Sequence, residues 1–407
     1  MSTSVGEEVT YELEMAGDHL YQMRVVSTLD MVNREAWDRC VGPAGSPFLK
    51  YDFLRGLEVC ECVSEEAGWS PRYLLMVRDR QLVACVSAYR KMHSQGEFIF
   101  DWSWADAAHS AGLPYYPKLT VTSPFSPIAS EKLLIDDLNV DEADRVEVKR
   151  LLLMGLRSLC QREPVTGLHI LFASESESEH LGDWGGLVRH TLQFQWTNED
   201  YADFDDFLSR FRAKRRHQIR RERRLLRESG VTVNAYLGSD ILPTHIPLIY
   251  DFYRATVEKY FYGNLYLNIE FFEHLYTHMR EHLCILLAER DGEVIGGSFN
   301  LINDGVLYGR YWGCHPDVQV PFLHFEVCAY RGIELCIERG WKRFEAGAGG
   351  GGHKFGRGFL PRVIYSTHEV YLPGFKEALT EALTKEREYI DEQLKSAVGE
   401  VLKEPNS

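Results

Sequence analysis

The sequence contains no apolar run long enough to cross a lipid bilayer. Its longest runs, residues 168–172 and 283–288, have the length of a strand, whereas a membrane-spanning helix needs about 20 apolar residues. The first residues include two glutamates where a secretory signal would carry positive charge and then an apolar core. We therefore expect a disordered leader over residues 1–20, no membrane span and a cytoplasmic location.

The chain also lacks a cysteine framework. Its 9 cysteines are an odd number without regular spacing, and only Cys60 and Cys62 lie close together. No second Cys or Cys/His pair with ligand spacing follows them, so a zinc site is not indicated. We expect reduced thiols and no bound metal.

Positive charge is scarce over the chain as a whole. The formal net charge of −15 argues against a general nucleic-acid coat protein, because such proteins need positive charge to displace counterions from phosphate. Hydrophobic residues make up 45% of the chain, which is enough to fold it, and 407 residues fit two domains better than one core. Any polyanion must therefore meet a local patch.

Strand and helix patterns alternate along the chain, and their order recurs after residue 200, which favours an internal duplication. The elements that carry this pattern are antiparallel meanders over 72–77, 81–89 and 97–101 and over 284–290, 294–303 and 306–314, and helices over 140–160, 204–228 and 322–338. The pattern predicts an α/β fold with mixed sheets. We expect N-terminal and C-terminal domains over 21–197 and 198–372, followed by a helix and tail over 373–407.

One local patch of positive charge does occur. Residues 210–227 hold ten Lys or Arg against a single acid, Glu222, so this segment carries +9 while the rest of the chain carries −24. On a helix, Arg212, Arg216, Arg220, Arg223 and Arg227 form a stripe beside an apolar face, and guanidinium groups suit phosphate or carboxylate. We expect an anion-binding helix, with Arg216, Arg220 and Arg223 contacting substrate. The alternative is a solvated helix whose charge balances acidic neighbours.

A glycine-rich segment and an aromatic cluster are further candidate sites. Glycines 349–352 precede His353, Lys354 and Arg357; consecutive glycines let backbone amides approach an anion, although the segment also suits a hinge. The cluster lies near Asp101, Tyr116 and Lys118, where aromatic rings and charges favour a binding cleft or plain packing equally.

Several motifs together resemble one family. They are Phe100-Asp101-Trp102, Tyr115-Tyr116-Pro117-Lys118, Lys214-Arg215-Arg216, Ile219-Arg220-Arg221-Glu222-Arg223, Leu307-Tyr308-Gly309-Arg310-Tyr311-Trp312-Gly313, Pro321-Phe322-Leu323-His324-Phe325-Glu326 and Gly358-Phe359-Leu360-Pro361. In these motifs the chain resembles the predicted N-acyltransferases of the FemAB-like group, within the GNAT superfamily. The resemblance implies two tandem GNAT-like domains, as in the Fem transferases of peptidoglycan bridges. Residues 315–320 depart from the usual GNAT pyrophosphate loop.

The resemblance implies an N-acyltransferase that moves an acyl or aminoacyl group to a primary amine. We expect no bound cofactor, acyl-CoA or aminoacyl-tRNA as co-substrate, a small-molecule or peptide amine as acceptor, and tRNA as a further partner. By the same resemblance, Lys354 and Arg357 lie near the acceptor site. The rival hypothesis is a non-catalytic protein that kept the fold and binds RNA or a phosphorylated partner through its basic helix.

Amide formation needs a base for the amine, a donor to the tetrahedral oxyanion and an acid for the leaving group. Glu345 is the first candidate for the base and Glu326 the second, and either carboxylate could equally serve in an ion pair. Lys354 would stabilise the oxyanion or an acceptor phosphate, and Tyr308 would be the acid. Strand alternation predicts that Arg310 and Trp312 share one face with Tyr308, so we count both, together with His353, as substrate contacts.

Overall fold

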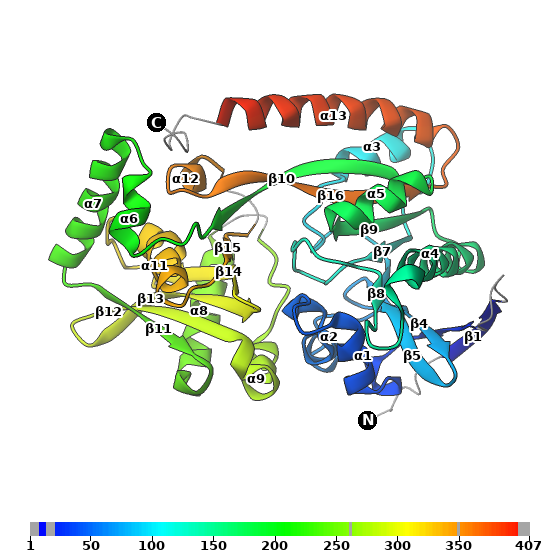
Figure 1. Ribbon diagram of the computed structural model, residues 1–407, viewed down its shortest axis with the longest axis horizontal. Helices are drawn as coiled ribbons and strands as arrows, with labels where there is room; N and C mark the ends of the chain where they lie inside the picture. Colours follow the sequence, from blue (N-terminus) through cyan, green and yellow to red (C-terminus); the bar gives the residue numbers. More distant parts are fainter. Residues whose placement is uncertain (1–7, 14–20, 260–262, 348–350, 398–407) are drawn as a thin grey trace. The chain divides into compact units, whose positions relative to one another are not determined.

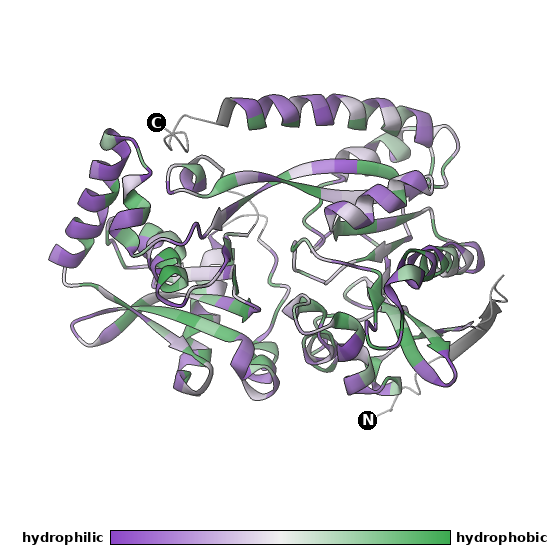
Figure 2. Ribbon diagram, viewed as in Figure 1, coloured by the Kyte–Doolittle hydropathy of each residue, from purple (hydrophilic) through white to green (hydrophobic). Residues whose placement is uncertain are grey.

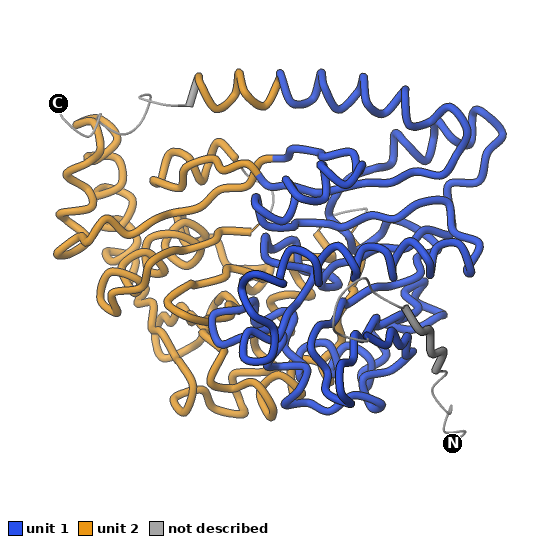
Figure 3. The backbone as a smooth tube through the Cα atoms, turned by 45° about the vertical axis from the view of Figure 1, so that its right-hand side comes forward, with its two compact units in different colours: residues 1–191, 364–388 blue, residues 192–363, 389–407 orange. Residues whose placement is uncertain are grey.

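The structure is a computed structural model that describes residues 8–13, 21–259, 263–347 and 351–397 (Figure 1). The chain divides into two compact units, which Figure 3 draws in different colours. Unit 1 takes residues up to 191 together with 364–388, and unit 2 takes 192–363 and the residues after 388. Parallel and antiparallel strand pairs both occur with helices around them, which confirms the mixed α/β fold class.

Unit 1 contains strands β1 to β9 and the first part of β10, up to residue 191. Its elements are β1 (Glu8–Leu13), β2 (Tyr21–Val26), α1 (Arg34–Val41), α2 (Tyr51–Val59), β3 (Trp69–Pro71), β4 (Tyr73–Arg78), β5 (Gln81–Val86), β6 (Ala88–Lys91), α3 (Trp102–Ser110), β7 (Lys118–Val121), β8 (Leu134–Ile135), α4 (Arg145–Arg162), β9 (Gly167–Ala173), α5 (Glu175–Asp183) and β10 (Leu187–Thr197). Strands pair in the orders β1-β2-β4-β5-β8 and β9-β7-β6-β3. Within the expected leader, residues 8–13 form β1 against β2, and the other residues of that segment lie outside the described residues.

The longest helix of unit 1 forms the centre of its core. Leu152, Leu156 and Leu159 recur at helical spacing in α4 and are buried against side chains of β2, β4 and β9. A second cluster joins α3 to the C-terminal helix α13 (Phe375–Ala397), with Trp104 packed among Phe375, Leu379 and other apolar residues. The sequence predicted helices in both regions, over 140–160 for α4 and over 373–407 for α13.

Unit 2 is built on a mixed sheet in the order β11-β12-β13-β14-β15-β10. Its elements are α6 (Phe204–Ser209), α7 (Ala213–Glu228), β11 (Thr232–Leu237), α8 (His245–Glu258), α9 (Ile269–His278), β12 (Leu283–Arg290), β13 (Glu293–Asn303), β14 (Val306–Cys314), α10 (Leu323–Phe325), the π-helix η6 (Glu326–Tyr330), α11 (Arg331–Glu338), β15 (Arg343–Glu345) and α12 (Gly351–Phe355). The strand β16 (Leu360–Val370) begins in unit 2 and continues into unit 1 from residue 364. The central strands are coloured hydrophobic in Figure 2, whereas α7 is hydrophilic along most of its length.

Helices cover both faces of this sheet. On one face, the rings of Phe272 in α9 and Tyr253 in α8 pack against Phe299 and Tyr311 of the sheet. Gly313 permits the close approach of α8, because a Cβ there would lie 2.0 Å from the Phe252 carbonyl oxygen. On the other face, apolar residues of α6, α7, η6 and α11 share one cluster with β12, β14 and β15.

Each unit is completed by a strand from the opposite half of the sequence. In unit 1, residues of β16 pair antiparallel with β9. In unit 2, residues of β10 pair antiparallel with β15. Each of these closing strands flanks a parallel pair, β7 with β9 and β14 with β15, and each parallel pair is three residue pairs long. The sheets are therefore closed by exchanged strands.

Three expected elements differ from the structure. Residues 97–101 form no strand, because Phe98 and Phe100 have positive φ angles that strands do not use. The expected helix over 204–228 is two helices, α6 and α7, separated at residues 210–212. The expected helix over 322–338 includes the π-helix η6 between α10 and α11, and a π-helix shifts the phase of the side chains that follow.

Candidate active site

The candidate site of unit 2 lies where two parallel strands part. β14 pairs with β15 only from Val306 to Tyr308, and β14 then continues to Cys314 after β15 has ended at Glu345. A cavity of about 420 Å³ lies beside this continuation. Most of its lining residues come from β13, β14, the α10–η6 segment, α12 and Arg357, which follows α12. The lining consists of Ser298, Asn300, Gly309, Arg310, Tyr311, Trp312, His324, Phe325, Cys328, Ala329, His353, Lys354 and Arg357, together with Thr256, Phe344, Ala346 and Phe359.

A β-bulge in β14 re-aims its side chains at this point. Asn300 of β13 pairs with Gly309, and the preceding Phe299 pairs with Tyr311, so Arg310 is the extra residue. The bulge brings Arg310 and Trp312 to the cavity. Bulges that redirect side chains occur often beside active sites, and this one places a guanidinium at the parting of the strands.

Lys354 supplies a second cation to the cavity. Its Nζ donates a hydrogen bond to the Gly347 carbonyl oxygen at 2.6 Å. Burial, together with the nearby charge of Arg310, lowers the pKa of Lys354 to about 8. The ammonium form therefore dominates at neutral pH but is much easier to deprotonate than an exposed lysine.

His324 faces these cations as a neutral ring. Burial, reinforced by the charges of Arg357, His353 and Lys354, lowers its pKa to about 4. The Trp312 ring lies 4.8 Å from the His324 ring and helps to hold it. A neutral imidazole can accept a hydrogen bond or a proton, so the cavity contains an acceptor as well as donors.

Arg357 lines the cavity but is held by a buried network. Its guanidinium lies 3.2 Å from the centroid of the Phe325 ring and donates to the Glu222 carboxylate at 3.0 Å. Tyr330 donates to the same carboxylate. Glu222 is the single acid of the basic segment, and the structure turns it inward from α7. This carboxylate fixes Arg357, and with it the chain that follows α12.

No carboxylate lines the cavity among the residues that the structure describes. Arg310, Lys354 and Arg357 make the lining cationic, and the aromatic rings make its walls apolar. Such a cavity favours an electron-rich group, for example a carbonyl oxygen, a carboxylate or a phosphate.

A family model covers this site and nearly all of the sequence. Residues 28–401 match the model of the FemAB-like family, whose description is peptidoglycan biosynthesis/recognition. The chain belongs to the FemAB-like family. Membership supports a transferase of the acyl or aminoacyl type. A search of the curated proteins finds no match.

Solved structures show the same fold as this FemAB-like chain. FemX is 12% identical, with a TM-score of 0.51, and the match covers 83% of this chain and 96% of FemX. The C-terminal domain of a putative lysylphosphatidylglycerol synthetase from Agrobacterium fabrum is also 12% identical, with a TM-score of 0.51 and coverage of 86% and 95%. The likeness confirms the fold implied by the sequence resemblance, that of the Fem transferases with two tandem GNAT-like domains.

In this FemAB-like chain, Glu345 and Tyr308, which were predicted to be catalytic, do not line the cavity. Phe344 and Ala346 line the cavity, so by strand alternation the intervening Glu345 faces the opposite side of β15. Tyr308 pairs with Glu345 in register, and burial together with the Glu345 charge raises the pKa of Tyr308 to about 12. The prediction that Tyr308 shares a face with Arg310 and Trp312 is wrong, because the bulge at Arg310 interrupts the alternation.

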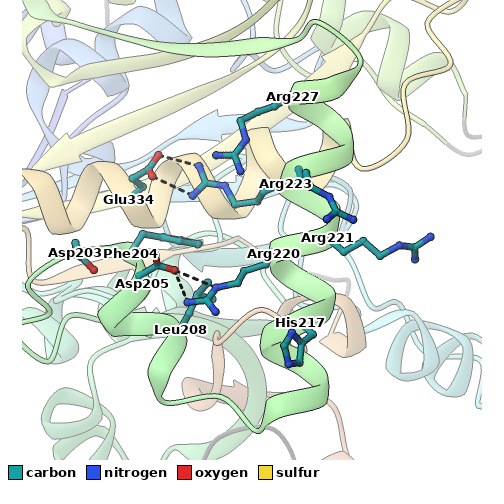
Figure 4. Close-up of a pocket in the computed structure, with 11 residues that line it drawn as sticks. Asp203, Phe204, Asp205, Leu208, His217, Arg220, Arg221, Arg223, Arg227 and Glu334 are labelled. Atoms are coloured by element: carbon teal, nitrogen blue, oxygen red, sulfur yellow. Dashed lines mark hydrogen bonds and ion pairs between the residues drawn. The ribbon is translucent and has the colours of Figure 1, made fainter.

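Glu326 and Arg223 form a buried ion pair. The Arg223 guanidinium contacts Glu326 at 2.7 Å and Glu334 at 3.0 Å, and Figure 4 shows the contacts to Glu334. Burial lowers the pKa of Arg223, but the two carboxylates outweigh it and leave that pKa raised. The structure thus gives Glu326 the ion-pair role that the sequence left as an alternative, and it satisfies Arg223 within the protein.

The other predicted substrate contacts on α7 differ from one another. Arg220 pairs with Asp205 at 2.9 Å. Arg216 is half-buried and has no acidic partner among the described residues. Neither residue lines the cavity that holds Lys354, so the structure separates the basic helix from that group of candidates.

The Asp101 cluster lies in unit 1 and is closed to solvent. Lys118 is completely buried, and its Nζ contacts Asp101 at 2.5 Å and Glu97 at 2.8 Å. Burial opposes the charge on Lys118, yet the two carboxylates raise its pKa. Tyr116 is half-buried, and its ring centroid lies 5.7 Å from the Lys118 Nζ. The charges of Lys118, Asp101 and Glu97 pair with one another, which is the packing alternative, although Asp101 Oδ1 has no hydrogen-bond partner in the described part of the chain.

Sequence reasoning missed several residues of the cavity. His324 lies inside a motif that carries the family resemblance, but from that motif only Glu326 was named, as the second candidate for the base. The side chains of Ser298 and Asn300 gave no signal, because a polar residue in a strand reads as an outward-facing position. Cys328 lies in the π-helix, and burial raises the pKa of its thiol, so it stays protonated.

Among the described residues, no helix is long and apolar enough to cross a membrane, and no group of three or more His, Cys, Asp and Glu side chains could hold a metal ion.

Proposed function

We propose that the cavity of unit 2 is the acyl-transfer site of an N-acyltransferase, which passes an acyl or aminoacyl group from acyl-CoA or aminoacyl-tRNA to a primary amine. The observation that carries the proposal is the meeting of Lys354, Arg310 and neutral His324 in one partly enclosed cavity. The family's description supports an acceptor from peptidoglycan synthesis, such as the side-chain amine of a muropeptide.

The chemistry follows from the charge of each group. The acceptor amine attacks the acyl carbonyl carbon, a C–N bond forms, and negative charge develops on the carbonyl oxygen. The Lys354 ammonium and the Arg310 guanidinium can stabilise this oxyanion by charge-assisted hydrogen bonds. Neutral His324 can accept the proton that the amine must lose, and it can return that proton to the donor's oxygen or sulfur when the tetrahedral intermediate breaks the bond to this leaving group.

The cavity has no carboxylate base among its described lining residues, which shapes the expected substrates. A cationic acceptor would be repelled by Lys354 and Arg310, so the amine must arrive neutral or carry compensating negative charge nearby. A muropeptide, with its carboxylates, meets this condition. The cationic lining therefore favours an acceptor that is acidic overall.

The test is a transfer assay with mass spectrometry as the readout. Donors are acetyl-CoA, longer acyl-CoAs and aminoacyl-tRNAs, and acceptors are amine-bearing muropeptides. We expect an amide product with at least one pair, loss of that product with Lys354→Ala, and no loss with Lys342→Ala, an exposed lysine of the same unit. A product from any donor would exclude the non-catalytic rival. Equal product from wild type and Lys354→Ala would refute the proposed site.

A further inference from the structure

The basic helix α7 carries more positive charge than its neighbours balance. Of the ten cations in residues 210–227, four pair with acids: Arg210 with Glu199, Arg220 with Asp205, Arg223 with Glu326 and Glu334, and Arg224 with Glu228. The other six form no ion pair among the described residues, although the charge of Arg227 also acts on Glu326, and we call them the basic face: Arg212, Lys214, Arg215, Arg216, Arg221 and Arg227. Balancing by acidic neighbours therefore accounts for less than half of the charge.

The order of charges along α7 opposes helix stability. Lys214, Arg215 and Arg216 lie in the first turn, which has no acid, and the N-terminal end of a helix already carries partial positive charge. Glu228 lies at the other end, where the helix dipole is negative. The neighbouring like charges also repel one another at i,i+3 and i,i+4 spacing. An external anion would relieve this repulsion, whereas no acid of the described part of the protein pairs with Lys214, Arg215 or Arg216.

The basic face is extended rather than focused on one point. From Arg212 to Arg227 the helix rises about 22 Å, at 1.5 Å per residue. This length matches roughly six phosphates of a nucleic-acid strand, whose phosphates are spaced about 3.4 Å along the axis. A cavity of about 740 Å³ lies beside Arg221 and Arg227 of this face, between α6, α7 and α11 (Figure 4). Its lining also holds further cations of α7 and the acids Asp203, Asp205 and Glu334.

The side chains of α7 argue against a lipid surface. A helix that lies on a membrane needs an exposed apolar face beside its cations. In α7 the apolar residues Ile219 and Leu226 are buried in the core of unit 2. No large hydrophobic side chain that the structure describes in α6 or α7 is exposed. The surface that α7 presents is therefore polar and mainly cationic, with Glu228 as an exposed acid at its end.

We propose that the basic face of α7 binds the phosphodiester backbone of a nucleic acid, at a site separate from the acyl-transfer cavity. Guanidinium groups pair with phosphate oxygens in a bidentate manner, and an extended row of them binds a backbone without reading its bases. The site lets a protein of net charge −15 hold a polyanion locally. The inference does not depend on acyl transfer, since none of the six residues of the basic face lines the cavity of Lys354.

The test measures binding of fluorescein-labelled U20 RNA and dT20 DNA by anisotropy across a range of salt concentrations. We expect wild-type binding that weakens with salt. Arg212→Gln, Arg221→Gln and Arg227→Gln together should weaken it at least about tenfold at low salt and lower the log–log salt slope by about 2, at roughly 0.7 per phosphate contact. The control carries Lys376→Gln, Lys385→Gln and Lys395→Gln, three exposed lysines of α13 with the same change of charge, and should bind like wild type.

Thermal melting checks that both triple variants fold. If one oligomer binds more strongly, the result shows whether the basic face prefers RNA or DNA, and either preference supports the inference. Failure of wild type to bind either oligomer, or equal loss in the control variant, would overturn it. Binding only to vesicles with 30% phosphatidylglycerol, abolished by the α7 substitutions, would also overturn it in favour of lipid. Lys354→Ala should bind like wild type, so failure of the transfer proposal is seen separately.

Discussion

At the scale of single residues, Lys354 links the geometry of the cavity to a pH dependence. Its side chain is half-buried, it lies near Arg310, and its pKa is lowered to about 8. A lysine is charged below its pKa, so the ammonium that would stabilise an oxyanion is present at pH 7 and lost above about pH 8. An exposed lysine would keep its charge up to a pH about two units higher.

We expect kcat/KM to fall as the pH rises through about 8, because deprotonated Lys354 no longer carries the charge that stabilises the oxyanion. Lys354→Ala should lower kcat about 100-fold or more, as expected when one oxyanion donor is removed. Lys354→Arg should keep part of the rate and lose the decline near pH 8, because arginine stays charged. A decline near pH 8 that persists in Lys354→Arg would assign it to another group. The measurement is a pH profile of kcat/KM.

Glu345 gives a contrasting prediction. Its carboxylate lies 3.2 Å from Arg343 and faces away from the cavity lining. We therefore expect Glu345→Gln to change kcat/KM by less than tenfold, against about 100-fold for Lys354→Ala. Complete loss of turnover in Glu345→Gln, with an unchanged melting temperature, would instead support the role as base that the sequence first suggested. Both variants are compared in the same transfer assay.

Residue patterns in the sequence located part of the cavity. Lys354, His353 and Arg357 were chosen because cations follow a glycine run, and all three line the cavity. Glycines 349 and 350 lie outside the described residues, so the cradle expected of them remains a prediction. Arg223 was expected to contact substrate as part of the cationic stripe, and Glu326 was the second candidate base, but the two side chains form an ion pair with each other. Sequence alone does not separate a site role from an ion pair.

At the scale of elements, two adjacent residues of α7, Glu222 and Arg223, hold different parts of unit 2 in place. Glu222 holds Arg357, which lines the cavity, while Arg223 holds Glu326 of the π-helix η6 and Glu334 of α11. The exposed cations alternate with these inward residues along the same helix. The helix is therefore anchored by two charged residues that its composition had suggested were part of a uniformly external surface.

We expect Arg223→Gln to lower the free energy of unfolding by about 3 kcal/mol, because it leaves the buried Glu326 carboxylate without its cation. Arg221→Gln is the matched control on the same helix; Arg221 is exposed and has no acidic partner among the described residues, so its change should stay within about 0.5 kcal/mol. Urea unfolding measures both. Equal stability of the two variants would show that the Arg223 ion pair contributes little. The sequence alone does not separate these two arginines, since both belong to one cationic run.

Elements with strong periodicity could be predicted, and irregular ones could not. The meander of β12, β13 and β14 and the helix α4 lie where apolar spacing and turn residues indicated. The bulge at Arg310 and the π-helix η6 each insert one residue into a regular pattern, and no residue type demands either. Both irregularities adjoin the cavity, so the least predictable backbone is where the candidate site lies.

At the scale of the whole molecule, the exchanged strands decide what can fold alone. In unit 1, β9 has β7 on one side and needs β16 on the other. In unit 2, β15 has β14 on one side and needs β10 on the other. The cluster of Trp104 in unit 1 also needs Phe375 and Leu379 of α13. A cut after residue 198 would therefore leave each fragment without part of its own unit. An order of elements repeated in the sequence suggested two successive domains, but it carries no information on which strand closes which sheet.

We expect fragments 1–198 and 199–407, expressed separately, to show no cooperative thermal transition, because fragment 1–198 lacks β16 and α13 and fragment 199–407 lacks β10. Co-expression should restore a complex, since the missing strands are then supplied in trans. As a control, a protease site inserted between Glu199 and Asp200, both exposed, should be cut in the folded chain while the two pieces still co-elute on gel filtration. A cooperative transition in fragment 1–198 alone would show instead that β9 and the Trp104 cluster need nothing from the second half of the sequence.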